Sequence, residues 1–122
     1  MKRIGILFLA FTFTATLAFA GSLDRISMSK DKQFQDRIRY YLFAKAKTVL
    51  EAQTPDADDL ALAKKIYAGQ FPDQHMALVI IHNTAIGTAI DNRTAITDSD
   101  IEWAVNDQFD EMADAYTAAG LN

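Results

Sequence analysis

The chain has 122 residues, of which 50% are hydrophobic and 23% charged, and its formal net charge is −4. It contains no cysteine, which excludes disulfide cross-links and thiolate chemistry. The acidic balance disfavours nucleic acid as a partner, and the apolar content is sufficient for one packed domain rather than a disordered chain.

The first twenty residues have the pattern of a secretory signal peptide. Lys2 and Arg3 give a positive start, residues 4–20 are uncharged, and a small-x-small triplet ends at Ala20. This run has 17 residues including three threonines, whereas a membrane-spanning helix needs roughly 20 strongly apolar residues. We therefore expect a removable leader over 1–20 and no stable membrane anchor after its removal. A buried or anchoring N-terminal helix is the alternative.

The expected domain organisation is a linker over 21–29 followed by one helical domain over 30–119. Met28 lies just before the first convincing helix, so translation could start at Met1 or at Met28. Charge is unevenly distributed along this domain. Residues 21–65 hold nine basic and seven acidic side chains, while residues 66–122 hold one basic and nine acidic side chains.

The first helix is expected over 30–53. Its apolar side chains recur at steps of three and four residues, which is the spacing of a core-facing helical stripe. The residues of this stripe are Phe34, Ile38, Tyr41, Leu42, Ala46, Val49 and Leu50.

The second helix is expected over 55–68, with Thr54 as its N-cap and Pro55 at its first position. Gly69 follows it as a natural C-terminal stop. The predicted inner face consists of Leu60, Ala63, Ile66 and Tyr67.

The third and fourth helices are expected over 73–90 and 98–118. The run at 76–81 is apolar enough to be a buried strand, but helical spacing continues to Ile90, which favours a helix. Thr97 and Asp100 resemble a capping box at the start of the last helix. The predicted fold is therefore a compact all-α domain of four helices with short connections.

No residue pattern predicts a metal or cofactor site. His75 and His82 would lie about 10.5 Å apart along one helix, too far to bind one metal ion without other ligands. Residues 91–102 have the length of a calcium loop, but Ile96 stands where the turn requires glycine. Without a phosphate loop or a nucleophile motif, we expect the protein not to be an enzyme.

Aromatic and basic side chains off the main apolar stripe suggest a surface that contacts a partner. Tyr40 and Phe43 lie off the stripe of the first helix, next to Arg37, and Trp103 lies in the last helix. Because interfaces are enriched in aromatic residues and arginine, these four residues are the predicted partner surface.

The last helix begins with an acidic cap followed by Ile-Glu-aromatic-x-Val-Asn, over residues 98–106. With this segment, the order of features over about 28–117 resembles short all-α proteins of tailed bacteriophages, found among virion-structure genes. The other residues that carry the resemblance are Phe34, Arg37, Tyr40, Tyr41, Lys45, Ala46, Ala63, Lys64, Gly69 and Asn83 to Ile86. Such proteins begin near the equivalent of Met28, so the leader is atypical for them.

The resemblance implies a non-enzymatic virion or assembly protein that works through protein–protein surfaces. Its partners would be copies of itself or other virion proteins, such as a capsid or tail component, and its location the virion or the host cytoplasm during assembly. The alternative, favoured by the leader, is an exported small helical binding protein of the periplasm.

Overall fold

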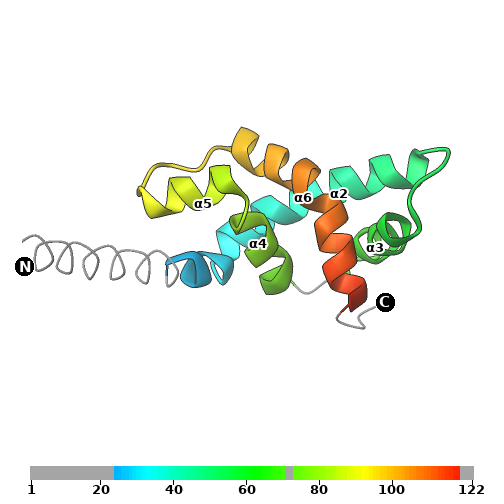
Figure 1. Cartoon of the computed structure of the whole chain (residues 1–122), viewed down its shortest axis with the longest axis horizontal. Helices are drawn as coiled ribbons and strands as arrows, with labels where there is room; N and C mark the ends of the chain where they lie inside the picture. Colours follow the sequence, from blue (N-terminus) through cyan, green and yellow to red (C-terminus); the bar gives the residue numbers. More distant parts are fainter. Residues whose placement is uncertain (1–23, 71–72, 119–122) are drawn as a thin grey trace, which may run out of the picture.

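The computed structural model describes residues 24–70 and 73–118, and every regular element among them is helical (Figure 1). From residue 32 onward, the described helices are α2 (Lys32–Glu51), α3 (Ala57–Tyr67), α4 (Asp73–Ile81), α5 (Thr84–Asp91) and α6 (Asp98–Ala118). Residues 24–29 are helical as well. The expected all-α class is therefore confirmed, while the leader over 1–20 lies outside the described residues. No helix in the described part is both long and apolar enough to cross a membrane.

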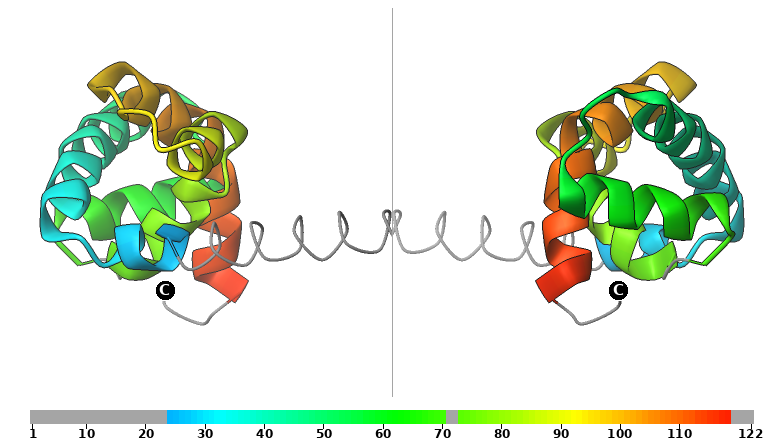
Figure 2. Two further views of the ribbon diagram at one scale, coloured as in Figure 1. Left: turned by 90° about the vertical axis from the view of Figure 1, so that its left-hand side faces the viewer. Right: turned by 90° about the vertical axis from the view of Figure 1, so that its right-hand side faces the viewer.

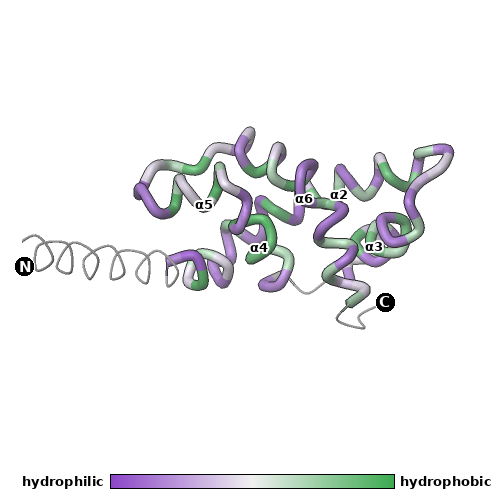
Figure 3. Tube along the Cα trace, in the orientation of Figure 1, coloured by the Kyte–Doolittle hydropathy of each residue, from purple (hydrophilic) through white to green (hydrophobic). Residues whose placement is uncertain are grey.

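Helices α2, α3 and α6 all contact one another and enclose most of the core. Figure 2 shows them as three sides of a frame, with α4 between α2 and α6 and α5 packed on α4 and α6. Along α2 and α6, hydrophobic and hydrophilic residues alternate with the turns of the helix (Figure 3). Fully buried side chains come from all five helices and include Leu42, Leu62, Ile66, Met76, Ile80, Ile86, Ile101 and Phe109.

Local capping explains where several helices begin and end. The Asp31 carboxylate accepts the backbone N–H of Phe34 at 2.8 Å and starts α2. Thr97 and Asp100 exchange side-chain to backbone hydrogen bonds of 3.0 and 3.2 Å, which confirms the capping box of α6. Gly69 follows α3 with a φ of 77°, the left-handed conformation that glycine adopts without cost.

The second helix differs from its prediction in its start and in its inner face. Asp56 rather than Thr54 is the N-cap, because its carboxylate accepts the backbone N–H groups of Asp58 and Asp59. Leu62 is buried with Ala63 and Ile66, whereas Tyr67, predicted to face inward, is 49% exposed. Because Leu62 and Ala63 both face inward, the buried face of α3 is centred between them and Tyr67 lies at its edge.

The prediction of a single helix over 73–90 is wrong, because the helix is interrupted between α4 and α5. Asn83 has an extended ψ of 137°, and its side-chain oxygen accepts the backbone N–H of Ala85 at 2.9 Å. Its amide nitrogen donates to the Asp107 carboxylate of α6 at 3.2 Å. A short amide side chain that can cap a new helix competes with continuation of the old one. The described fold therefore has two short helices where one long helix was predicted.

Replacing Asn83 by alanine should lower the free energy of unfolding by about 1–2 kcal/mol, because a cap is lost and the link to Asp107 disappears. Urea unfolding measures this change. Asn106→Ala is the matched control, since the Asn106 amide is exposed and donates only to the Glu102 carbonyl within α6. Equal effects of the two substitutions would contradict the structural role of Asn83.

Candidate functional site

The exposed side of α2 carries two aromatic side chains. Tyr40 is 71% exposed and Phe43 is 45% exposed. Together with Asp36 and Lys47 they follow steps of four, three and four residues, so they share one outward stripe of the helix. The inward stripe of α2 is already filled by the buried residues Phe34, Ile38, Leu42, Ala46 and Val49.

Phe43 does not stand alone on this side of the molecule. Its ring stacks on that of Tyr67 in α3, with the ring centroids 4.7 Å apart and an interplanar angle of 20°. Tyr40 meets Tyr41 edge to face, at a centroid distance of 5.1 Å. Tyr67 was predicted on the core face of α3, so its place on the surface was not expected from the sequence.

We call this region the aromatic surface and define it by Tyr40, Phe43 and Tyr67 with two exposed lysines, Lys47 and Lys64. Lys47 lies one turn after Phe43 on α2, and Lys64 lies one turn before Tyr67 on α3. The aromatic surface therefore combines half-exposed rings with positive charge.

Arg37, predicted to belong to the partner surface, is used inside the molecule. Its guanidinium contacts the Asp98 carboxylate at 2.9 and 3.0 Å and donates to the Ile96 carbonyl at 2.9 Å. These bonds fix the segment before α6 against α2. Arg37 thus positions the chain and is not a principal part of the aromatic surface.

Trp103 is 54% exposed but belongs to a different region of the surface. It lines a hollow of about 410 Å³ formed by α4, α5 and α6, in which Asp107 and Glu111 also lie. Asp114 continues this exposed side of α6. We call Trp103, Asp107, Glu111 and Asp114 the acidic ridge.

The four residues of the predicted partner surface therefore do not form one patch. Tyr40 and Phe43 are brought together, Arg37 bonds internally, and Trp103 lies on the acidic ridge. Three exposed carboxylates and no basic residue of α6 lie on the acidic ridge, so the ridge is negative.

Residues 24–29 do not form the linker that was expected over 21–29. Arg25 donates to the Asp91 carboxylate at the end of α5 through two nitrogens, and Arg93 contacts Asp24 at 2.7 Å. Each of the two paired segments thus supplies one acid and one base. Ser29 is buried, and Met28 packs against the core. This N-terminal clamp extends the folded part of the chain upstream of Met28.

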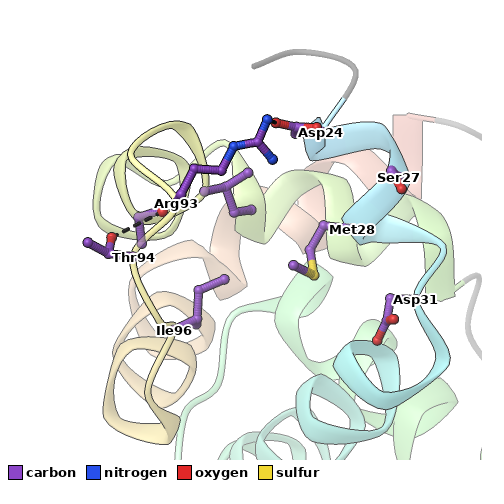
Figure 4. A pocket seen from close by; sticks show the side chains of 9 residues that line it. Asp24, Ser27, Met28, Asp31, Arg93, Thr94 and Ile96 are labelled. Carbon is purple, nitrogen blue, oxygen red and sulfur yellow. Dashed lines mark hydrogen bonds and ion pairs between the residues drawn. The ribbon is translucent and has the colours of Figure 1, made fainter. Parts of the chain in front are cut away.

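A pocket of about 360 Å³ lies beside the clamp, between residues 24–31 and the end of α5 (Figure 4). Met28 and Ile96 line it together with the Arg93 side chain, which reaches across to Asp24 in Figure 4. Arg93 has a φ of 60°, a conformation that costs a non-glycine residue roughly 1–3 kcal/mol. Because the Arg93 side chain lines the pocket and also pairs with Asp24, this wall of the pocket is part of the N-terminal clamp.

An unusual carboxylate pair lies between α3 and α6, away from the clamp. Partial burial raises the pKa of Asp59 from 3.8 to about 7, helped by a hydrogen bond to the Asp110 carboxyl and by its charge. The charge of Asp56 acts in the same direction, while that of Lys45 lowers the pKa. Asp59 therefore holds a proton at this helix contact under mildly acidic conditions.

The histidines and the calcium-loop segment are arranged as follows. In the described part of the chain, no three His, Asp or Glu side chains are positioned to hold a metal ion. The Nε2 atom of His75 is buried without a hydrogen-bond partner there, and His82 is exposed. Of the acids at 91–102, Asp91 pairs with Arg25, and Asp100 caps α6.

Comparison with protein-family models, with curated proteins and with solved structures finds no match to this chain. The candidate site is therefore assigned from its own geometry, as an exposed aromatic surface on α2 and α3 and an acidic ridge on α6.

Gly87→Ala should destabilise the fold by about 1–3 kcal/mol, although glycine to alanine in an exposed helix is stabilising by roughly 1 kcal/mol. A Cβ at position 87 would lie 2.9 Å from the Ile81 carbonyl oxygen and 3.2 Å from a guanidinium nitrogen of Arg25. Urea unfolding of this variant, with the exposed neighbour Thr88→Ala as control, tests the close packing of the clamp. A more stable Gly87→Ala variant would contradict it.

Asp59→Asn should reduce the loss of stability between pH 5 and pH 8. The pKa of Asp59 is raised to about 7 in the folded state. The contribution of protonated Asp59 to the free energy of unfolding is therefore complete below its unfolded pKa, and it is lost as the pH rises through about 7. Thermal melts of the wild type should therefore show a lower melting temperature at pH 8, and the variant a smaller decrease. Asp58→Asn makes the same charge change in the same helical turn and should leave the decrease unchanged.

Proposed function

We propose that this chain is a small helical subunit of a tailed-phage particle, or of its assembly, and that it acts through protein–protein contacts rather than catalysis. The observation that carries the proposal is the Phe43–Tyr67 stack, in which two aromatic rings from different helices are held together and left about half exposed. Aromatic side chains are enriched at protein interfaces and dominate their binding energy.

The rigidity of this surface supports the same proposal. Phe43 and Tyr67 stand on helices whose other faces are packed in the core, so their rings are presented in a fixed arrangement. A preorganised aromatic surface loses little conformational freedom when a partner binds. The partner would be a second copy of the chain or another structural component of the particle.

The phage assignment is supported by the sequence resemblance centred on 98–106. This segment forms the first turns of α6, with the capping box at its start and Ile101 in the core. The resemblance assigns no catalytic role to any residue.

Incorporation into particles provides the test. In phage that encode the chain, mass spectrometry of purified particles should detect it, and Phe43→Glu should reduce its amount at least tenfold by disrupting the aromatic surface. Thr88→Glu, at an exposed position of α5, should be incorporated like the wild type. Repeated absence of the wild-type chain from purified particles would overturn the proposal.

The exported helical binding protein is the second candidate, favoured by the signal-peptide pattern that ends at Ala20. Sequencing the N-terminus of the expressed product separates the two functions. A periplasmic product beginning at Gly21 supports export, whereas a product beginning at Met28 or Ser29 supports the phage subunit.

A further inference from the structure

The aromatic surface and the acidic ridge differ in charge as well as in position. The aromatic surface carries the exposed lysines Lys47 and Lys64 beside Phe43 and Tyr67. The nearby Asp36 is paired with Arg39. The acidic ridge carries three exposed carboxylates, Asp107, Glu111 and Asp114, and α6 contains no basic residue. The two surfaces share no residue, and they lie on different sides of α6. Tyr40 lines a hollow with Glu102 and Asn106, whereas Trp103 and Asp107 line one with α4 and α5.

Each surface also has an apolar centre with charge around it. On the aromatic surface, the centre is the Phe43–Tyr67 stack with Lys47 and Lys64 beside it. On the acidic ridge, the centre is Trp103, and Asp107 follows it one turn later on the same side of α6. Apolar centres within charged rims of opposite sign are the complementary halves of a protein interface.

We infer that the aromatic surface of one copy docks on the acidic ridge of a second copy. The occupant of each surface is thus the other surface of an identical chain, and opposite charge selects this pairing over the pairing of like surfaces. This inference deepens the proposed function, on which it rests for its biological role, by naming the partner as a second copy.

A contact between two different surfaces of the same chain leaves one of each free at the ends of a dimer. It is therefore a head-to-tail contact, which extends into a ring or a filament rather than stopping at two copies. Pairing of two aromatic surfaces across a twofold axis would instead stop at a dimer. The two arrangements predict different behaviour when variants are mixed.

The experiment uses the full chain in the form recovered from cells, measured by sedimentation from about 1 µM to about 1 mM, the range of moderate to weak affinities. The wild type should form species larger than a dimer as concentration rises. Raising the salt from about 0.05 to about 0.5 M should weaken association at least fivefold, because the charges around both centres are exposed.

Phe43→Glu removes the aromatic surface and Trp103→Lys removes the acidic ridge, so each variant alone should remain monomeric. Mixed in equal amounts, the two should form a dimer and nothing larger, since one intact surface of each kind is present. Circular dichroism checks that both variants fold. Lys47→Glu, an exposed charge reversal beside Phe43, replaces Phe43→Glu if the latter unfolds.

A wild type that stays monomeric overturns the inference, and so does a Trp103→Lys variant that dimerises alone, because that result shows pairing of like surfaces. The double variant Phe43→Glu with Trp103→Lys must be monomeric, since association of this variant would place the contact elsewhere in the chain. These outcomes are independent of particle incorporation. A monomeric chain found in particles overturns self-docking alone, while an associating chain absent from particles overturns the phage function alone.

Discussion

The mutual packing of α2, α3 and α6 is the constraint on which the other features of the molecule depend. Each of these helices directs one stripe of side chains into the same interior, where Leu42, Ile66 and Phe109 are buried. Once these stripes are fixed, the orientation of every other position on the helices is fixed as well. Tyr40, Phe43 and Trp103 are exposed because the positions that face inward are already occupied.

The parts of the fold that follow from local sequence were predicted well. The stripe of α2 and the capping box of α6 depend on residues within one or two turns of each other, so spacing alone identifies them. The bounds of α6 agree with the prediction for the same reason. The spacing of apolar residues identifies the buried face of a helix when the helix packs against the core on one side only.

The failures concern features for which the spacing of apolar residues gives no single answer. Asn83 keeps helical spacing with the apolar residues around it, so the break between α4 and α5 is visible only through its bonds to Ala85 and Asp107. Arg25 and Asp91 are 66 residues apart, and no local pattern connects them. Tyr67 was misplaced because Leu62 competes for the interior in a short helix, where one residue shifts the inward face. Two of the three rings of the aromatic surface, Tyr40 and Phe43, were therefore predictable, and Tyr67 was not.

The N-terminal clamp bears on whether a leader ending at Ala20 is removed before or after the domain folds. Asp24, four positions after Ala20, is already bonded to Arg93 in the folded domain. A peptidase that cuts after Ala20 must hold the residues on both sides of the cut in an extended form. If the leader is removed there, removal and closure of the clamp compete for the same short stretch of chain, and cleavage is fastest before the domain folds. A start at Met28 would avoid this competition, but it would leave Asp91 and Arg93 without the partners that residues 24 and 25 provide.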